Sequence, residues 1–506
     1  MESLGLESDI QLGRDVAVPS ELSDWLSRPK PLWIGGKPEL SSKLFQSINP
    51  ASESVLAQIS EANQEHVNRA VSSARKVFES GVWSKKSQSH RAAVLGKIAD
   101  CLEEHRSELA ILESLDTGKP IRESFEGDIP RAAQNFRFFA SYDEREEIRY
   151  ENPRDVHRSF REPIGTCVLI TPWNLPLYLE SWKLAPALLM GNSCILKPSE
   201  LTPLTAAYFV SLIEKKGLLP PGVLQLLHGF GENSAGAMLT SHPDIDAISF
   251  TGETDTGRAI MRSAAVGPTR VSFELGGKGA SVVFEDADLD AAISTITRAA
   301  FRNQGQICLA SPRIYIHNNI YATFKERFLS AVDGIKVGPP LSGKTTMGAL
   351  ISGEHRQKVE SYIRRVEPPA EILCGGERPK HLDRGFFLEP TVIEGLSDSS
   401  PLTCEEIFGP VASLYSFSED DEVVNRVNAT PYGLSCSVWT RDDGRAQRVS
   451  EALRMGLVWV NAWFLRDLRV PFGGQKRSGL GREGGTHSLD FFSEWKSVSW
   501  PARKEG

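Results

Sequence analysis

Apolar and polar residues follow two different rhythms along the chain, and these rhythms predict its helices and strands. Apolar residues at 67, 70, 71, 74 and 78 recur at the spacing of one helix face. A longer pattern of the same kind predicts a helix from about 89 to 114, stopped by the turn 116–120. A third helix is predicted to begin near Asp128.

From about residue 160, short apolar runs alternate with segments that can form helices. The runs are 167–170, 194–196, 224–227 and 247–250, and each ends at a polar or glycine-containing turn. Such alternation predicts a parallel, doubly wound sheet whose carboxyl ends hold a ligand. The rhythm restarts after Gly277 with the run 281–284 and continues to about Val470, so we expect a second α/β domain.

The two ends of the chain differ from this central part. Residues 1–32 are polar and irregular, and are predicted to be a lead-in segment, followed by a short hairpin that begins at 32–36. The tail, 491–500, is predicted to be a strand with no obvious partner beside it. Because an exposed strand edge invites pairing, this tail predicts a contact with another chain.

Composition narrows the class of protein. The 506 residues are too many for one core, so two or three domains are expected. The net charge of -8 argues against binding to nucleic acid or to a membrane surface, and no apolar run is long enough to span a bilayer. The seven cysteines are scattered without a CxxC pair, which predicts neither a metal site nor a disulfide framework. The N-terminus resembles neither a signal nor a transit peptide, and we expect a cytoplasmic protein.

One cysteine lies where chemistry is possible. The segment 301–308 ends a predicted helix and places Cys308 in a glycine-containing turn, just before a predicted strand at 313–317. A cysteine at such a junction can face a cleft and act as a nucleophile. The more common fate of a single cysteine is to pack as a small buried hydrophobe.

Two strand ends carry polar side chains that suit a carbonyl group under attack and a nucleotide. Asn174 lies between two prolines, which can hold its amide in one orientation to stabilise an oxyanion; a structural turn cap is the alternative. Lys197 and Glu200 follow the next strand, where Glu200 can accept from a ribose 2'-hydroxyl and repel a 2'-phosphate. This pair favours NAD over NADP, unless it is only a surface ion pair.

Two further strand ends contain glycine. The turn 250–257 can open a helix toward a phosphate, but neither it nor 229–231 has the full GxGxxG pattern. Glu274 precedes two glycines, and partial burial there would raise its pKa and suit a general base. An ordinary loop glutamate is the alternative.

Together these segments resemble the aldehyde dehydrogenase superfamily. The resemblance rests on Cys308 with its flank, Asn174 in Pro-Trp-Asn, Glu274 in Glu-Leu-Gly-Gly-Lys and the segment 405–411, and covers about residues 30–500. It implies an α/β fold with two doubly wound parallel-sheet domains and a small oligomerisation sheet. By this resemblance, 1–30 is a lead-in, 31–142 and 162–275 form the NAD-binding domain, 276–480 forms the catalytic domain, and 143–161 and 481–506 are oligomerisation segments.

The resemblance also implies roles for individual residues. Cys308 would form a thiohemiacetal whose oxyanion is held by the Asn174 side chain and the Cys308 backbone N–H, and Glu274 would activate the water that hydrolyses the thioester. Lys183 is a further catalytic position. The implied NAD-binding positions are Thr171, Pro172, Trp173, Lys197, Ser199, Glu200, Gly231, Phe250, Thr251, Gly252, Leu275, Gly276, Glu406 and Phe408. Glu253 stands where many relatives have serine, and its carboxylate would repel a phosphate.

The substrate is suggested by other segments. The stretches 128–140, 172–178, 463–474 and 481–492 resemble the muconic semialdehyde branch of the superfamily, which acts on products of aromatic ring cleavage. Arg131 and Arg466 match the positions expected to bind the substrate carboxylate, with Arg469 nearby; two structural salt bridges are the alternative. The other implied substrate-binding positions are Leu175, Trp182, Ile307 and Phe472.

Three hypotheses follow from the sequence. The first is an NAD-dependent, non-acylating dehydrogenase of a 2-hydroxymuconic or 2-aminomuconic type semialdehyde. The second is the same chemistry on a betaine-like, aromatic or aliphatic aldehyde, and the third is a non-catalytic protein on the same scaffold. A homodimer or homotetramer is expected, with a small-molecule aldehyde as the other partner.

Overall fold

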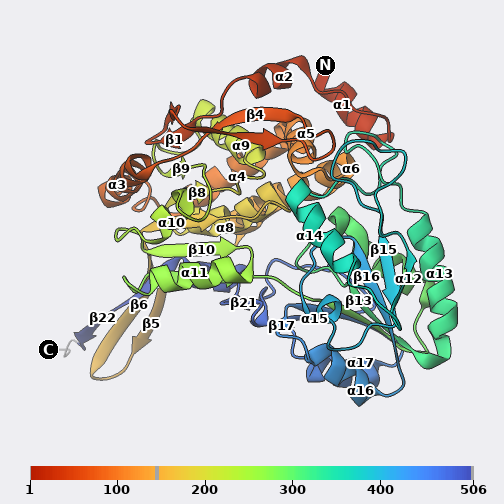
Figure 1. Cartoon of the computed structure of the whole chain (residues 1–506). Helices are drawn as coiled ribbons and strands as arrows, with labels where there is room; N and C mark the ends of the chain where they lie inside the picture. The colour runs from red at the N-terminus through yellow and green to blue at the C-terminus, as the bar shows by residue number, and fades with distance from the viewer. Residues whose placement is uncertain (1, 143–146, 503–506) are drawn as a thin grey trace.

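A computed structural model of the chain describes residues 2–142 and 147–502, and contains two large β-sheets with helices on both faces (Figure 1). A narrow three-stranded arm projects away from them at the lower left of Figure 1. No helix within these ranges is long and apolar enough to cross a membrane. The predicted α/β architecture is confirmed.

The first sheet has eight strands, in the order β2-β1-β9-β8-β7-β10-β11-β21. Its strands are β1 (Leu32–Ile34), β2 (Lys37–Glu39), β7 (Thr166–Ile170), β8 (Ser193–Lys197), β9 (Leu224–Leu226), β10 (Ala247–Thr251), β11 (Arg270–Glu274) and β21 (Gly479–Leu480). The central strands from β9 to β11 run parallel. The predicted strand positions and hairpin therefore agree with the structure.

Alternate residues of these strands enter different cores. Val168 and Ile170 pack in one cluster, whereas Cys167 and Leu169 pack in another. Helices of the first cluster are α3 (Gln64–Ser80), α10 (Ala235–Thr240) and α11 (Thr254–Ala264). Helices of the second include α4 (Gln88–Glu104), α5 (Arg106–Thr117), α7 (Ile129–Ser141), α8 (Pro176–Leu189) and α9 (Leu204–Lys215). Both faces are covered, which explains why the strands are apolar throughout.

Two helix predictions need correction. The expected single helix over 89–114 is two helices, because His105 adopts a non-helical backbone (φ -107°, ψ 25°) and separates α4 from α5. The expected irregular lead-in contains α1 (Glu2–Gln11) and α2 (Ser20–Ser27). Leu22 and Leu26 lie four residues apart and are buried together, which gives α2 an apolar face.

The second sheet has seven strands, in the order β14-β15-β16-β13-β12-β18-β19. They are β12 (Ala280–Val283), β13 (Arg313–His317), β14 (Glu371–Cys374), β15 (Thr391–Glu394), β16 (Val411–Phe417), β18 (Ser435–Trp439) and β19 (Leu457–Val460). The surrounding helices are α12 (Leu289–Phe301), α13 (Tyr321–Asp333), α14 (Gly353–Ile363), α15 (Pro401–Cys404), α16 (Asp420–Asn428) and α17 (Asp443–Ala452). The second parallel sheet predicted from the sequence is thus present.

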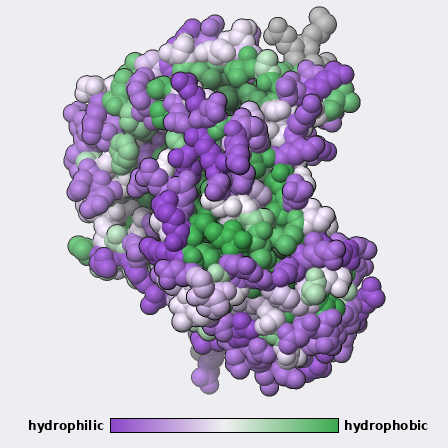
Figure 2. Space-filling view, turned by 45° about the vertical axis from the view of Figure 1, so that its right-hand side comes forward, coloured by the Kyte–Doolittle hydropathy of each residue, from purple (hydrophilic) through white to green (hydrophobic). Residues whose placement is uncertain are grey.

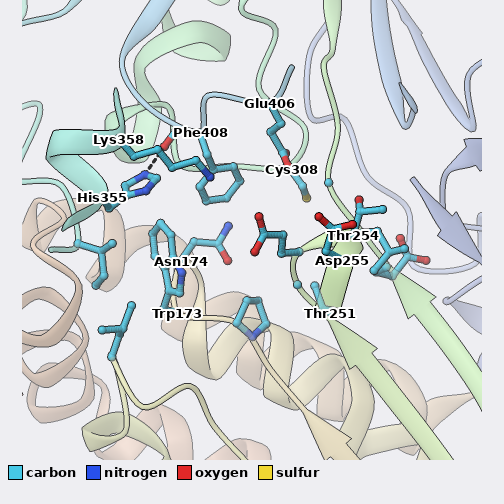
Figure 3. Close-up of a pocket in the computed structure, with 18 of the residues that line it drawn as sticks. Trp173, Asn174, Thr251, Thr254, Asp255, Cys308, His355, Lys358, Glu406 and Phe408 are labelled. Atoms are coloured by element: carbon cyan, nitrogen blue, oxygen red, sulfur yellow. Dashed lines mark hydrogen bonds between the residues drawn. The ribbon is translucent and has the colours of Figure 1, made fainter. Parts of the chain in front are cut away.

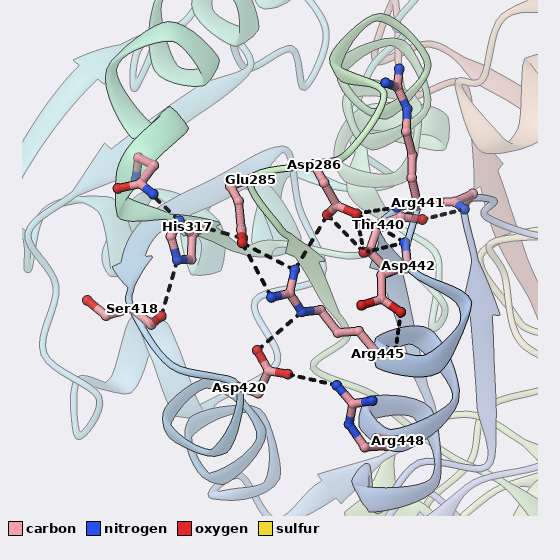
Figure 4. Close-up of polar contacts among 12 residues, drawn as sticks. Glu285, Asp286, His317, Ser418, Asp420, Thr440, Arg441, Asp442, Arg445 and Arg448 are labelled. Carbon is pink, nitrogen blue, oxygen red and sulfur yellow. Dashed lines mark hydrogen bonds and ion pairs between the residues drawn. The ribbon is translucent and has the colours of Figure 1, made fainter.

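Ion pairs occupy the carboxyl ends of the second sheet (Figure 4). Arg445 lies 3.3 Å from Glu285 and 3.5 Å from Asp420, and its guanidinium packs over Phe284. Thr440 donates to Asp286 at 2.8 Å. This edge is closed by charged contacts, whereas the loop with Cys308 precedes β13 and lies at the opposite edge.

The arm consists of β5 (Glu147–Glu151), β6 (Asp155–Pro163) and β22 (Ser493–Pro501). The tail strand β22 pairs with β6 of the same chain, from Ser493 opposite Pro163 to Pro501 opposite Asp155. The expectation of an unpaired tail strand is therefore wrong. The segment 143–161, which the resemblance assigns to a small oligomerisation sheet, is part of a hairpin from 147 onward, and 143–146 lie outside the described residues.

Smaller elements connect these parts. They are β3 (Leu44–Ile48), β4 (Val55–Ser60), α6 (Ile121–Glu123), a π-helical turn (Ser124–Asp128), the 3-10 turns Arg302–Gly305 and Asn318–Ile320, β17 (Tyr432–Gly433), β20 (Gln475–Lys476) and α18 (Gly485–Phe491). The C-terminal segment returns to the first sheet, since β21 pairs with β11 and Asn192 donates to the Phe492 carbonyl at 2.8 Å. Figure 2 shows a mainly hydrophilic face with apolar side chains gathered in a hollow near its middle.

Candidate active site

A cavity of about 480 Å³ lies where the carboxyl ends of the first sheet face the loop before β13. The predicted site residues that line it are Pro172, Trp173, Asn174, Thr251, Gly252, Glu274, Leu275, Gly276, Cys308, Glu406 and Phe408. In Figure 3 the side chains of Cys308, Asn174 and Glu406 lie around the same space. The segments that follow β7, β10 and β11 are thus brought together with the loop that carries Cys308.

The turn before Cys308 has an unusual backbone. Asn303, Gln304 and Gly305 have φ values of 50°, 59° and 69°, in the left-handed region. A Cβ on Gly305 would lie 2.2 Å from the Gly409 carbonyl oxygen, so only glycine fits there. This run of left-handed residues ends α12 and turns the chain so that Cys308 faces the cavity.

Two glutamines hold this turn against the segment 348–351. Gln304 donates to the Ala349 carbonyl at 2.8 Å and accepts from the Gly348 N–H. Gln306 accepts from the Ile351 N–H at 3.0 Å. The position of the thiol is therefore set by buried side-chain to backbone bonds.

Asn174 stands opposite the thiol and is almost fully buried. Its side-chain amide donates to the Gln306 carbonyl at 2.9 Å. The backbone carbonyl of Asn174 accepts hydrogen bonds from the Asn303 side chain and from the Lys119 ammonium, each at 3.0 Å. The amide belongs to a network that also fixes the cysteine turn, as an oxyanion donor requires.

The Cys308 thiol is protonated at rest. Burial, together with the carboxylates of Glu406 and Glu274, raises the pKa of Cys308 to about 12, although the positive charge of Arg466 opposes the shift. Since the thiolate is the nucleophile, attack requires that a base or the bound substrate assist loss of the proton.

Glu274 ends β11, lines the same cavity as Cys308 and is a candidate for that base. Burial and the charge of Glu483 raise its pKa well above the usual value, while Lys183 and Arg482 lower it. Both carboxyl oxygens make no hydrogen bond within the described residues. A buried carboxyl with free oxygens and a raised pKa fits a general base, as the sequence predicted.

Lys183 does not line the cavity but lies behind Glu274. Its ammonium donates to Ser249 at 2.9 Å and to Glu483 at 2.7 Å. Lys183 therefore acts on the site through charge, by lowering the pKa of Glu274. Glu483 is a site residue that the sequence reasoning missed, because it is distant in sequence and belongs to no recognisable motif.

One end of the cavity is shaped by aromatic rings. Trp173 packs against Phe408 at 5.3 Å and against His355 at 5.4 Å between ring centres. His355 contacts the Phe408 carbonyl at 2.7 Å, which supports the left-handed backbone of Phe408 (φ 59°) (Figure 3). His355 and Lys358, both on α14, also line the cavity and were missed, since no motif marks that helix.

The start of α11 forms another part of the wall. Glu253 is its N-cap and makes no side-chain cap hydrogen bond, so the first N–H groups of this 11-residue helix have no such partner. Thr254, Asp255 and Arg258 line the same wall, and Asp255 pairs with Arg258 at 2.6 Å. Glu253 lines the cavity too, so its carboxylate stands at the edge of a site suited to an anion.

Several predicted cofactor positions do not line this cavity. These are Thr171, Phe250, Lys197, Ser199, Glu200 and Gly231, on or after strands β7 to β10. The Lys197 ammonium lies 3.7 Å from Glu200, and burial lowers the pKa of Lys197. Leu201, the next residue, lines the cavity, so this loop reaches its wall.

Arg131 and Arg466 line a neighbouring cavity together with Tyr178 and Arg469. Arg466 lies 4.0 Å from the Trp182 ring centre and 4.2 Å from that of Phe472, and its Nη2 makes no hydrogen bond within the described residues. Arg131 lies 4.8 Å from the ring centre of Phe464. Within the described residues neither arginine forms a salt bridge, whereas Arg469 pairs with Asp467 at 2.6 Å.

Two of the rings that contact these arginines, Phe464 and Phe472, also pack in the apolar group that contains Cys308. Phe464 and Phe472 pack against an apolar cluster that also contains Ile307 and contacts Cys308. Trp182 on α8 and Leu175, which precedes that helix, are buried. Of the predicted substrate-binding residues, Ile307 and Phe472 therefore pack in the group that contains Cys308, and Trp182 and Phe472 contact the Arg466 guanidinium.

Comparison with known proteins agrees with this geometry. The model of the aldehyde dehydrogenase family matches residues 37–498. The chain belongs to the aldehyde dehydrogenase family. It is 44% identical over 468 residues to the 2-hydroxymuconic semialdehyde dehydrogenase of Pseudomonas sp. (strain CF600), an alignment that covers 90% of this chain and 96% of the relative. It is also 44% identical over 489 residues to a 2-aminomuconic 6-semialdehyde dehydrogenase of Pseudomonas sp., with coverage of 94% and 98%.

Solved structures of other aldehyde dehydrogenases share the fold. The betaine aldehyde dehydrogenase of Staphylococcus aureus, in complex with NAD+, is 38% identical with a TM-score of 0.91, and 95% of each chain is covered. The NAD+ complex of an aldehyde dehydrogenase from Bacillus cereus is 37% identical with a TM-score of 0.93, covering 97% of this chain and 100% of that one. This protein is therefore an aldehyde dehydrogenase, and the hypothesis of a non-catalytic scaffold is set aside.

Proposed function

We propose that this aldehyde dehydrogenase oxidises a muconate-type semialdehyde, of the 2-hydroxymuconic or 2-aminomuconic kind, to the dicarboxylic acid with NAD. The assignment of the substrate rests on the Arg466 guanidinium. This group lies between aromatic rings and has no carboxylate partner within the described residues. A guanidinium without a partner can bind a carboxylate in a bidentate fork.

In the proposed reaction, the Cys308 thiol gives its proton to the Glu274 carboxylate as the sulfur attacks the aldehyde carbon, and the carbonyl oxygen becomes an oxyanion. The Asn174 amide and the Cys308 backbone N–H donate to this oxygen. The carbon then loses its hydride and a thioester remains, while Glu274 releases its proton to solvent. Glu274 next takes a proton from a water that attacks the thioester carbon, the carbon–sulfur bond breaks, and the carboxylic acid leaves with the Cys308 thiolate as the leaving group. The unpaired, buried oxygens of Glu274 support this role.

The residues around the cavity fit NAD, which when bound supplies the acceptor for the hydride. The free N–H groups at the start of α11 suit a diphosphate. Glu406 accepts from the Gly277 N–H at 2.8 Å, and a Cβ on Gly276 would lie 2.0 Å from its other oxygen, so the glycine pair leaves room for this carboxylate. Glu200 would accept from the adenine-ribose hydroxyl and disfavour a 2'-phosphate.

The test compares aldehydes of different charge. NADH formation is measured with 2-hydroxymuconic semialdehyde, betaine aldehyde and a simple aliphatic aldehyde, for the wild type and for Arg131→Ala and Arg466→Ala. We expect the muconic substrate to be preferred, and both variants to raise its KM at least about tenfold while the aliphatic aldehyde is unaffected. Arg469→Ala is the matched control, since Asp467 already holds that guanidinium.

A preference for another aldehyde, with both arginine variants unchanged, would contradict the muconic substrate. The betaine-like, aromatic or aliphatic alternative would then stand, on the same chemistry.

We also propose that the protein forms a homodimer or homotetramer through the arm. In the described residues β5 and β22 are the outer strands of the three-stranded sheet, and each has one edge without a partner. Sedimentation of the full chain and of a chain ending at residue 492 tests this. Both chains sedimenting as the same oligomer would exclude the arm as the contact.

A further inference from the structure

Lys119 lies buried behind Asn174, in a place that the proposed chemistry does not use. It follows the left-handed Gly118 (φ 80°) at the end of α5, and its side chain is 0% exposed. Its ammonium lies 2.6 Å from Asp128 and 3.5 Å from Glu113, and donates to the Asn174 carbonyl at 3.0 Å. A buried charge of this kind is expensive unless it is paired and hydrogen-bonded.

The partners keep Lys119 charged. Burial lowers the pKa of Lys119, but Asp128 and Glu113 outweigh burial and raise it overall. Burial raises the pKa of Glu113 to about 7, and Asp128 is the nearer of the two carboxylates, at 2.6 Å from the ammonium. The ammonium thus keeps the protons that it donates to Asp128 and to the Asn174 carbonyl.

The peptide of Asn174 is held from two sides. Asn303, in the left-handed turn before Cys308, donates to the same carbonyl at 3.0 Å and to the Gln306 carbonyl at 3.2 Å. The Asn174 side chain donates to that Gln306 carbonyl at 2.9 Å. Loss of the Lys119 contact would leave the carbonyl of Asn174 held only by Asn303, which belongs to the cysteine turn itself.

We propose that Lys119, held by Asp128, is a positioning residue that fixes the main chain of Asn174 and so aims its amide at the oxyanion of the Cys308 adduct. The inference rests on the proposed role of Asn174. Asp128 ends the π-helical turn Ser124–Asp128 and lies three residues before Arg131. One turn of chain therefore supports the oxyanion amide and carries a proposed substrate-binding arginine.

The test measures the step in which the oxyanion forms. Lys119→Met removes the charge with little change of volume, and the double variant Lys119→Met/Asp128→Asn avoids leaving a buried carboxylate unpaired if the single variant does not fold. We expect the pre-steady-state burst of NADH, with an aliphatic aldehyde that the wild type turns over, to slow about 10- to 100-fold. The dissociation constant of NAD and the rate of Cys308 alkylation by iodoacetamide should stay within about twofold, because alkylation forms no carbonyl oxyanion.

A cycle with Asn174→Ala separates positioning from general damage. If Lys119 acts through the Asn174 amide, Lys119→Met should slow the burst less than about twofold when Asn174 is already alanine. Lys325→Met on α13 is the matched control, since it removes a partly buried ion pair with Glu394 at the end of β15, in the second sheet. It should leave burst and alkylation rates at wild-type values.

Three results would overturn the inference. The first is a wild-type burst rate in Lys119→Met, and the second is a burst in the double variant with Asn174→Ala that is slowed by the product of the two single effects. The third is alkylation of Cys308 that is slowed as much as the burst. The proposed function fails differently. If Asn174→Ala itself keeps the wild-type burst, the role of Asn174 is wrong and the inference falls with it. If Asn174→Ala is slow while Lys119→Met is not, only the positioning role is wrong.

Discussion

The ammonium of Lys183 and the carboxylate of Glu483 lie 2.7 Å apart in a region closed to water, and both charges act on Glu274. After burial, the Glu483 charge is the largest cause that raises the pKa of Glu274. A base must lose its proton before it can activate water, so the pH at which Glu274 ionises sets the acid limit of thioester hydrolysis.

Replacing Glu483 with glutamine should move that limit to lower pH. The change removes a repulsive charge while the attractive charge of Lys183 remains, so the pKa of Glu274 falls. The measurement is the pH profile of kcat under conditions where hydrolysis limits turnover. Arg482→Gln is the control of opposite sign, because Arg482 lowers the pKa of Glu274. A shift of both variants in the same direction would show that another group titrates.

Alkylation of Cys308 in the enzyme without ligands should be slow at neutral pH and rise about tenfold per pH unit up to about pH 11. The reason is that burial and the nearby carboxylates raise the pKa of Cys308 to about 12, and only the thiolate reacts. Glu406→Gln removes the larger of the two carboxylate contributions, so its alkylation should be faster at every pH below that. A plateau below pH 9 in the wild type would contradict the raised pKa.

Arg466→Lys should not be a conservative change. The planar guanidinium packs over Trp182 and Phe472, and a lysine ammonium offers neither that stacking nor a bidentate fork. We expect KM for the carboxylated substrate to rise by about the same tenfold or more as in Arg466→Ala, with little change for an aliphatic aldehyde. Steady-state kinetics with both substrates decides this, and full rescue by lysine would reduce the role of Arg466 to its charge.

Glu200→Gln should improve the use of NADP relative to NAD. The carboxylate stands 3.7 Å from Lys197, and its removal takes away the repulsion of a 2'-phosphate. The ratio of kcat/KM for the two cofactors should shift toward NADP by about tenfold or more. An unchanged ratio of the two kcat/KM values would mean that the adenine ribose does not bind beside Glu200.

Gly305→Ala should damage both stability and activity. The left-handed backbone (φ 69°) and the close Gly409 carbonyl leave no space for a methyl group. Strain of this kind costs on the order of 1–3 kcal/mol, and the turn would have to shift the thiol to relieve it. Thermal inactivation half-life and burst rate test this, with Gly96→Ala on α4 as the control, because nothing lies within 4 Å of a Cβ there.

The parts of the structure that follow from local pattern could be predicted from the sequence. Residues 167–170 form a strand because both faces of the sheet are covered, and Cys308, Asn174 and Glu274 meet because strand ends converge at one edge. Glu483, His355 and Lys119 could not be found this way. Their roles depend on contacts between segments up to 300 residues apart, such as that of Lys183 with Glu483, which no local spacing encodes.

The break at His105 and the helices before residue 30 were missed for a related reason. His105 departs from helical backbone without a glycine or proline to announce it. The helix α2 has only Leu22 and Leu26 on its apolar face, too few to distinguish it from a polar segment without knowing the core that they enter.

The return of β21 to the first sheet has a consequence for how the chain is made. Strand β11 ends at Glu274, but its outer neighbour is formed by residues 479 and 480, so the whole second sheet is synthesised between them. During translation the first sheet stays open at that edge until residues 479 and 480 have left the ribosome. A nascent chain stalled before residue 480 would expose β11 to pairing with neighbours, so synthesis beyond the second sheet is itself a condition for a closed first sheet.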